Sequence, residues 1–213
     1  MKKYIKAMVV DVANEPYDIR LEIAENPTTQ ESALFQLADD ESESVRFAVA
    51  KNPNISERIL YKLSDDPEVE IVYKIAHRID LPIDILEKLS NHESKYVRRE
   101  VAKNPNTPAS ILNRLANDSD EHVRLCVVVN PNTTEEILNT LISDSKLGIR
   151  LEIAKKSDLS IDILNALSND SHWMVRMLVA DNPATPEDIL QKLAKDEFAI
   201  VSTTAEERLG KSE

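Results

Sequence analysis

Two residue types on which many folds depend are scarce in this sequence. Glycine occurs 2 times in 213 residues, and aromatic residues make up 4% of the chain. Tight turns in β proteins and the phosphate loops of α/β nucleotide-binding enzymes use glycine, because it readily adopts positive φ and lets the backbone approach a ligand. The composition therefore favours an all-helical protein over either of those classes.

Cysteine is almost absent as well. Cys126 is the single cysteine, which excludes an intramolecular disulfide, a cysteine-based zinc site and a cysteine-ligated iron–sulfur cluster within this chain. The 4 histidines lack the helical spacing of a metal motif, and there is no glycine-rich phosphate loop. We therefore expect no cofactor, no metal and no catalytic residues.

Long hydrophobic runs are also missing. No segment approaches the roughly 18 apolar residues of a membrane span, and polar residues interrupt the N-terminus before a signal core could form. The net charge of −12 makes nucleic-acid binding unlikely, because phosphate backbones repel such a surface. We expect a cytoplasmic protein that does not contact a membrane; its oligomeric state is not encoded in these patterns.

What the sequence does have is a period of 26 residues, on which three features recur in phase. Val-Arg or Ile-Arg pairs occur at 19–20, 45–46, 97–98, 123–124, 149–150 and 175–176, Asn-Pro pairs at 26–27, 52–53, 104–105, 130–131 and 182–183, and spaced leucines follow each unit. Fixed self-similarity of this kind is typical of repeat proteins. We predict about seven repeats.

Each repeat is predicted to contain two short helices. In the fourth repeat, Val97 and Val101 lie one helical turn apart, and the helix should end at Asn104 because a proline follows. Thr107 then resembles an N-cap, with Pro108 at the first helical position. Helices this short are unstable alone, so stacked neighbours must bury them, as in a solenoid.

The motif Val-Arg-x-x-Val-Ala-x-Asn-Pro-x-Thr-Pro-x-x-x-Leu-x-x-Leu-Ala-x-Asp, which residues 97–118 match closely, resembles the leucine-rich repeat variant family. The resemblance extends over roughly residues 19–200, and the Asp-x-x-x-x-Val-Arg junction is also similar to HEAT and armadillo-like repeats. It implies a curved, non-catalytic all-α solenoid, for which we expect a right-handed superhelix. The second helix of each repeat is α or 3₁₀: the family resemblance implies the latter, and the long period allows the former.

The repeats fill the chain, so we predict a single solenoid domain over residues 1–213. Residues 1–18, with Tyr4, Ile5, Met8 and Val9, would form an N-terminal cap, and residues 19–200 the repeats. Residues 201–213 would supply a C-terminal cap helix and tail.

The repeated polar residues are expected to be structural, because functional arginines are seldom spaced evenly along a whole array. An aspartate precedes most of the arginines by six residues, as in Asp40 and Arg46, and we predict a charge-assisted pair between them; the arginine could instead bind loop carbonyls. Val72 and His92 interrupt the pattern, so residues 60–100 should contain the least regular junction. The asparagine of each Asn-Pro should cap freed helix carbonyls.

The third and sixth repeats replace Asn-Pro by Arg78-Ile79 and Lys156-Ser157. Both are followed by a related Asp-Leu-x-Ile motif, which indicates either a duplication of three repeats or a second loop type that uses Asp80 and Asp158.

The position roughly 200° around the first helix from its buried valine is apolar in most repeats, at 100° per residue. Its residues are Leu21, Phe47, Tyr73, Arg99, Leu125, Leu151 and Met177. One turn further on, the residue varies freely between Glu25, Lys51, His77, Lys103, Val129, Lys155 and Asp181. This stripe is typical of a partner-binding groove, although neighbouring helices could bury it as ordinary core. Trp173, Met174 and Tyr96, near helix starts, would extend such a surface.

We therefore predict a scaffold that binds a protein or peptide partner through its concave helical face. The candidate partner-binding residues are Phe47, Tyr73, Arg99, Leu125, Leu151, Met177, Lys51, His77, Lys103 and Trp173. The alternative is a HEAT-like nucleic-acid-binding or nucleic-acid-processing protein. It would need a basic face, and the scattered lysines and Arg99 supply only a thin one.

Overall fold

The computed structural model describes residues 11–210, and within that range it contains 15 α-helices and no strand, which confirms the all-α prediction. The chain divides into two compact units, residues 1–106 and 107–213, here called unit 1 and unit 2. The proposed N-terminal cap residues Tyr4, Ile5, Met8 and Val9 lie outside the described residues, as do 211–213 of the proposed tail.

Longer and shorter helices alternate along each unit. Unit 1 contains α1 (Tyr17–Glu25), α2 (Glu31–Leu37), α3 (Glu43–Lys51), α4 (Glu57–Leu63), α5 (Val69–Ala76), α6 (Ile83–Leu89) and α7 (Lys95–Lys103). Unit 2 contains α8 (Ala109–Leu115), α9 (Glu121–Val129), α10 (Glu135–Leu141), α11 (Leu147–Ala154), α12 (Ile161–Leu167), α13 (Trp173–Asp181), α14 (Glu187–Leu193) and α15 (Ala199–Gly210). We call the odd-numbered helices the first helices and the even-numbered ones the second helices.

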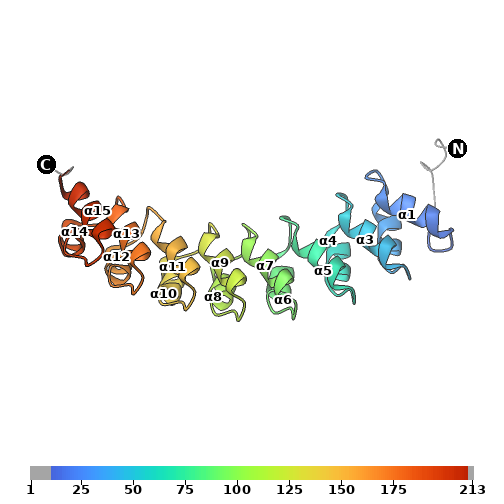
Figure 1. Cartoon of the computed structure of the whole chain (residues 1–213). Coiled ribbons are helices and arrows are strands. Elements are labelled where there is room, and N and C mark those ends of the chain that lie inside the picture. Colours follow the sequence, from blue (N-terminus) through green and yellow to red (C-terminus); the bar gives the residue numbers. More distant parts are fainter. Residues whose placement is uncertain (1–10, 211–213) are drawn as a thin grey trace. The chain divides into compact units, whose positions relative to one another are not determined.

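Helices of the same kind stack on one another within each unit. In unit 1, α1 packs on α3, α3 on α5 and α5 on α7, and each second helix packs against the next first helix (Figure 1). In unit 2, α9, α11, α13 and α15 follow the same order. The 26-residue spacing of the helix starts keeps equivalent side chains in register along each stack.

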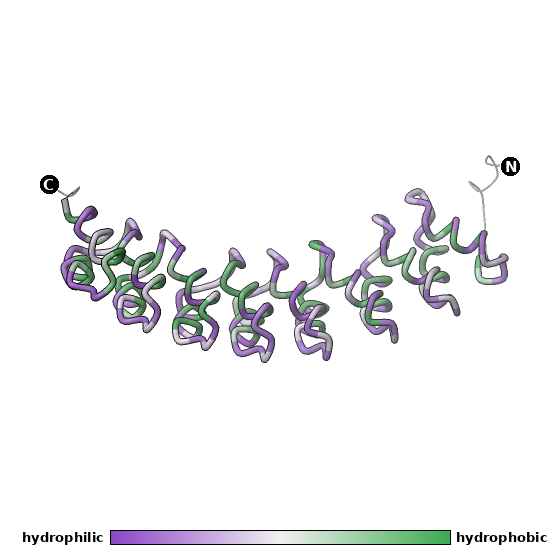
Figure 2. The backbone as a smooth tube through the Cα atoms, viewed as in Figure 1, coloured by the Kyte–Doolittle hydropathy of each residue, from purple (hydrophilic) through white to green (hydrophobic). Residues whose placement is uncertain are grey.

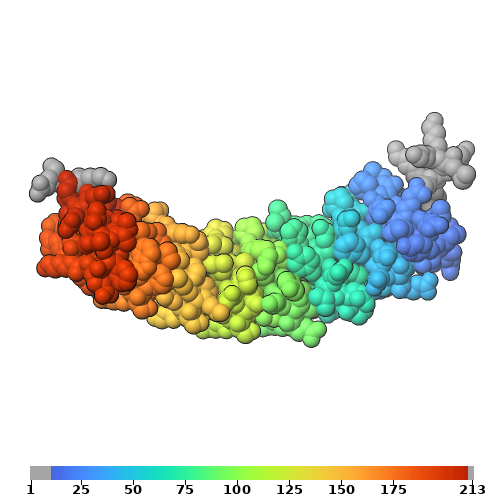
Figure 3. Space-filling view, in the orientation of Figure 1, coloured from blue at the N-terminus to red at the C-terminus, as the bar shows by residue number. Residues whose placement is uncertain are grey.

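The core lies between the two kinds of helix. Each second helix buries an isoleucine or alanine and two leucines, such as Ile59, Leu60 and Leu63 of α4, and each first helix buries residues such as Val45 and Val49 of α3. Loops are mostly hydrophilic, whereas the hydrophobic segments lie on the helices (Figure 2). Successive helix pairs within a unit abut directly in the space-filling view (Figure 3). Stacking therefore supplies the burial that the short helices cannot obtain alone.

The helix ends confirm one sequence prediction and correct another. Asn52, Asn104, Asn130 and Asn182 are each the C-cap of a first helix, as the following proline requires. The second helix of the fourth repeat begins at Ala109, so Thr107 is not its N-cap.

Threonines at the position of Thr107 in other repeats turn back toward the first helix. The hydroxyls of Thr29 and Thr185 each donate to a carbonyl near that helix's end, at 2.6 Å from the oxygens of Ile23 and Val179. A threonine hydroxyl satisfies a freed carbonyl as well as it accepts from an amide, so Thr-Pro alone does not reveal which helix it caps. The second helices are α-helical rather than 3₁₀. The number of repeats and the right-handed superhelix stay predictions.

Candidate functional site

The repeated arginines form a ladder, but not with the aspartates that the sequence suggested. Arg46 places Nε 2.7 Å and Nη2 3.1 Å from the two carboxylate oxygens of Asp66, which lies twenty residues later in the next repeat. The same bidentate arrangement joins Arg20 to Asp40, Arg124 to Asp144, Arg150 to Asp170 and Arg176 to Asp196. The predicted carboxylate pair between Asp40 and Arg46, six residues apart, is therefore wrong.

The backbone of the preceding aspartate takes the remaining arginine donor. Arg46 Nη1 donates to the carbonyl of Asp40 at 2.8 Å, and Arg150 Nη1 donates to that of Asp144 at 2.7 Å. The loop-carbonyl alternative is thus confirmed alongside a pairing between repeats. Each of these arginines thus binds the loop before its own helix and the equivalent loop of the next repeat, which explains why it recurs with the repeat.

Each aspartate of the ladder is almost fully covered and also shapes its loop. The side chain of Asp170 is 6% exposed, and its Oδ1 accepts the His172 amide at 2.8 Å. Burial acts to raise the pKa of Asp170, but the hydrogen bonds from Arg150 and the His172 amide outweigh it, so this pKa lies below its ordinary value. The pKa values of Asp144 and Asp196 are lowered as well, by the hydrogen bonds from Arg124 and Arg176 and from backbone amides.

The two substitutions that interrupt the pattern, Val72 for arginine and His92 for aspartate, remove one and the same arginine–aspartate pair, here called the missing rung of the ladder. Val72 and His92 are twenty residues apart, which is the spacing of every paired arginine and aspartate described above, so they occupy partner positions. Val72 is 1% exposed, as befits an apolar residue in the arginine's place. The prediction of one irregular junction within residues 60–100 rested on pairs six residues apart, whereas the pairs in the structure are twenty residues apart.

His92 keeps one of the two functions of the aspartate that it replaces. Its Nδ1 lies 3.0 Å from the Ser94 amide, which can only donate, so Nδ1 carries no proton. Burial lowers the pKa of His92 and the charge of Arg98 lowers it further, against an opposing effect of Glu93. The loop turn is thus conserved while the ion pair between repeats is lost.

The asparagines form a second ladder, as predicted. The Asn52 amide donates at 2.9 Å to the carbonyls of Ala24 and Asn26, at the end of the preceding first helix. Arg78 stands in the asparagine's place in the third repeat and donates Nη1 to the Asn52 carbonyl at 3.1 Å. Asp80 holds the Arg78 guanidinium at 2.9–3.0 Å, which agrees with the second-loop alternative for the third repeat.

The arginine–aspartate and asparagine ladders hold neighbouring repeats together. The remaining candidate for a functional site is the stripe on the first helices, formed by Leu21, Phe47, Tyr73, Arg99, Leu125, Leu151 and Met177. Tyr73 is 37% exposed, and the other stripe residues are half-buried. The next position around the helix is exposed in every repeat, at Glu25, Lys51, His77, Lys103, Val129, Lys155 and Asp181. The stripe is therefore neither closed core nor fully solvated surface.

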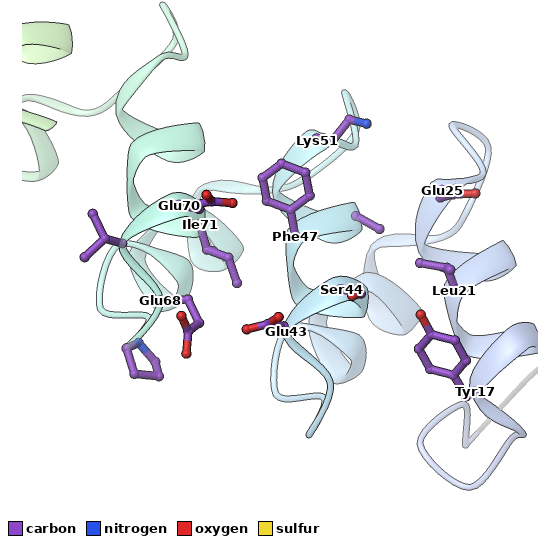
Figure 4. Close-up of a pocket in the computed structure, with 13 residues that line it drawn as sticks. Tyr17, Leu21, Glu25, Glu43, Ser44, Phe47, Lys51, Glu68, Glu70 and Ile71 are labelled. Carbon is purple, nitrogen blue, oxygen red and sulfur yellow. The ribbon is translucent and has the colours of Figure 1, made fainter. Parts of the chain in front are cut away.

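In unit 1, the stripe lines a groove of about 770 Å³ across α1, α3 and α5, here called the acidic groove. Leu21, Phe47 and the exposed Tyr17 supply apolar surface, and Glu43 and Glu68 extend into the space between α3 and α5 (Figure 4). The other residues that line it are Glu25, Ser44, Ala48, Lys51, Pro67, Val69, Glu70 and Ile71.

A second, smaller pocket of about 230 Å³ lies across α5 and α7. Two stripe residues, Tyr73 and Arg99, line it together with Tyr96, which is 57% exposed. Tyr96 thus lies beside two residues of the stripe. Four of the stripe positions, all in unit 1, line one of these two pockets.

The flanking residues differ in how far their charges are neutralised. The ammonium of Lys51 lies 5.7 Å from the centre of the Phe47 ring, a cation–π contact. His77 and Lys103 both bind the buried Glu100, at 2.9 and 2.7 Å. Lys103 and His77 are therefore engaged by Glu100 of α7, whereas Lys51 lies in the acidic groove.

The candidate residues of unit 2 lie on its own first helices. Leu125, Leu151 and Met177 are half-buried on α9, α11 and α13. Trp173 opens α13 and stacks on Phe198, with ring centres 6.2 Å apart and planes 18° apart. Leu125, Leu151 and Met177 therefore occupy equivalent positions on successive first helices. Trp173 instead contacts an aromatic residue just before the start of α15.

Several groove residues were missed by the sequence analysis. Tyr17, Glu43, Glu68 and Glu70 line the acidic groove although none belongs to the predicted stripe. Their common signal is position: each lies within one residue of the start of a first helix, where the residue varies from repeat to repeat. Stacking of α1, α3 and α5 then brings them together.

The described residues contain neither a metal-binding cluster nor a membrane-spanning helix. Among residues 11–210, no group of three or more histidine, cysteine, aspartate or glutamate side chains could hold a metal ion. No helix in that range is long and apolar enough to cross a bilayer.

Comparison with solved structures gives an informative similarity. No family model matches the sequence, and no curated protein matches it. A solved structure described as "a leucine-rich repeat variant with a novel repetitive protein structural motif" superposes with a TM-score of 0.72 at 26% identity, covering 91% of this chain and 77% of that one. This chain resembles a leucine-rich repeat variant. The resemblance inferred from the repeat motif is thereby confirmed.

Proposed function

We propose that this leucine-rich-repeat-variant-like chain is a non-catalytic scaffold that binds a protein or peptide partner on the face formed by its first helices. One observation carries the proposal: in unit 1 the first-helix residues that vary between repeats line open grooves, whereas the uniform residues form the ladders between repeats. A repeat protein commonly presents its binding surface in this way, with a constant frame and variable face residues.

The surface chemistry favours a protein or peptide over a nucleic acid. The acidic groove contains four glutamates and one lysine, and phosphate groups would be repelled by it. Lys103 and Lys155, counted earlier toward a basic face, bind Glu100 and Glu152. Their charges are therefore already balanced on the surface.

A random peptide library displayed on phage tests this proposal without assuming the partner's charge. Peptides enriched on the wild-type protein should bind Phe47→Asp or Tyr73→Asp at least about tenfold more weakly, because a buried apolar contact and its desolvation are lost. Ile83→Asp is the matched control, since Ile83 is 64% exposed on a second helix and undergoes the same chemical change.

Two results would overturn the proposal. One is the absence of any enriched peptide; the other is equal weakening by Ile83→Asp, which would place binding elsewhere. Salt-sensitive binding of duplex DNA by the wild-type protein would instead favour the nucleic-acid alternative.

A further inference from the structure

The acidic groove has an apolar floor and a rim in which four carboxylates outnumber the single cation, Lys51. Leu21 and Phe47 are half-buried between the stacked helices, and Tyr17 is 44% exposed beside them. Glu25, Glu43, Glu68 and Glu70 are all exposed around this floor (Figure 4). An apolar floor offers an anchor for a large side chain, while the rim sets the sign of the charge beside it.

These rim carboxylates are not neutralised by the protein itself. Within residues 11–210, none of Glu25, Glu43, Glu68 or Glu70 forms an ion pair. Arg46, the cation that both Glu43 and Glu68 influence, already binds Asp66 with two nitrogens. Like charges that converge without a partner favour binding of a cation from outside.

The protein's own contacts show how a cation is accommodated here. The Lys51 ammonium lies against the Phe47 ring in the groove, and it is the one cationic side chain in the groove lining. An aromatic face combined with carboxylates stabilises ammonium and guanidinium groups by cation–π attraction and charge. The same combination is available to a partner's lysine or arginine beside Tyr17.

The size of the groove indicates a short peptide segment rather than a small cation. Its volume of about 770 Å³ extends over three stacked helices, and helix axes pack roughly 8–10 Å apart. The span of about 16–20 Å corresponds to five or six residues of extended chain at about 3.3 Å each. A free amine would leave the apolar floor uncovered.

We propose that the acidic groove of unit 1 binds a cationic peptide segment in which lysine or arginine side chains alternate with large apolar ones. The apolar side chains contact Leu21 and Phe47, and the cations approach Glu43, Glu68 and their neighbours. This inference rests on the proposed scaffold function and adds to it the chemical class of the partner.

Fluorescence anisotropy with three labelled hexapeptides tests this inference. The probe alternates lysine and leucine; one comparison peptide replaces lysine by glutamate, and the other replaces leucine by serine. Wild-type protein should bind the lysine–leucine peptide at least about tenfold more tightly than either comparison, because both the charge and the apolar contact are needed. Raising salt above about 0.15 M should weaken its binding.

Two matched variants locate the binding site. Glu43→Gln with Glu68→Gln should weaken binding of the lysine–leucine peptide about fivefold or more and flatten its salt dependence, because rim charges are lost. Glu206→Gln with Glu207→Gln makes the same change in net charge on exposed residues of α15 and should leave binding unchanged. Phe47→Ser should weaken binding without altering its salt dependence.

The possible outcomes separate this inference from the scaffold proposal. Equal loss in the α15 control would show attraction to the net charge alone, and equal binding of the glutamate–leucine peptide would show a groove without charge preference; each overturns the inference. Absence of binding by the lysine–leucine peptide also overturns it. The scaffold proposal is judged separately by the phage library, which presupposes no charge.

Discussion

The loops and the first-helix face of this protein follow opposite rules. At the loops, aspartates and asparagines recur in register with arginines of the adjoining first helices, and they join neighbouring repeats at 2.6–3.4 Å. On the first-helix face, the residue at the stripe position changes from repeat to repeat, from Leu21 to Met177, and its side chain stays at least partly exposed. Regularity in a repeat protein therefore marks what holds neighbours together, and variation marks where a partner can be distinguished.

The largest expected effect comes from breaking a rung of the arginine–aspartate ladder. Asp170→Ala leaves the Arg150 guanidinium covered without its carboxylate, and removes the acceptor of the His172 amide. We expect a loss of about 3–5 kcal/mol in unfolding free energy, the usual effect of removing one member of a buried pair. Urea denaturation measures it.

Asp162→Ala is the control for that loss, because Asp162 is an exposed carboxylate in the first turn of α12. Its effect should stay below about 1 kcal/mol, as for a helix-dipole interaction. Similar values for the two variants would show that the ladder does not stabilise the array.

The missing rung offers the next largest effect. Val72→Arg alone places an unpaired charge at a buried position, and His92→Asp alone leaves a carboxylate without its arginine, so each should cost about 2–4 kcal/mol. The double variant restores the pair found in other repeats and should recover about 1–3 kcal/mol relative to the sum. Additive losses in this double-mutant cycle would contradict the pairing between repeats.

Hydrogen exchange extends the same comparison without mutation. Residues 60–100 contain the junction that lacks the arginine–aspartate pair of the ladder, and their amides should exchange faster than those near an intact rung such as 140–180. Uniform protection in the two segments would mean that the Asn52–Arg78–Asp80 contacts fully replace the lost pair.

The smallest effect is a pH dependence from His92. Because the pKa of His92 is lowered by folding, its contribution to stability is complete above its ordinary value of 6.5 and decreases as the pH falls below that value. His92→Asn keeps an acceptor for the Ser94 amide but does not titrate, so it should remove this part of the slope between about pH 7 and 5. An unchanged slope in thermal unfolding would contradict this contribution of His92.

Much of the fold could be predicted from periodicity, because buried valines and leucines and the Asn-Pro stops act locally within one helix. The arginine partners could not, since Asp40 and Asp66 are equally plausible partners for Arg46 until the stacking is known. Thr107 was misplaced for a similar reason: its hydroxyl can cap either adjoining helix. The stripe predicted Leu21 and Phe47 of the acidic groove, but Tyr17, Glu43 and Glu68 escaped prediction because they lie about 26 residues apart in sequence and come together only through the packing of α1, α3 and α5.

The central claim is that the stripe is binding surface and not core, and Phe47→Asp beside Val49→Asp tests it most directly. Both residues lie on α3, but Val49 is 0% exposed whereas Phe47 is half-buried in the acidic groove. We predict that Val49→Asp costs about 3 kcal/mol or more in unfolding free energy and Phe47→Asp less than about 1 kcal/mol, because only the first buries a charge. A loss for Phe47→Asp as large as that for Val49→Asp would show that the stripe is core and would contradict the account.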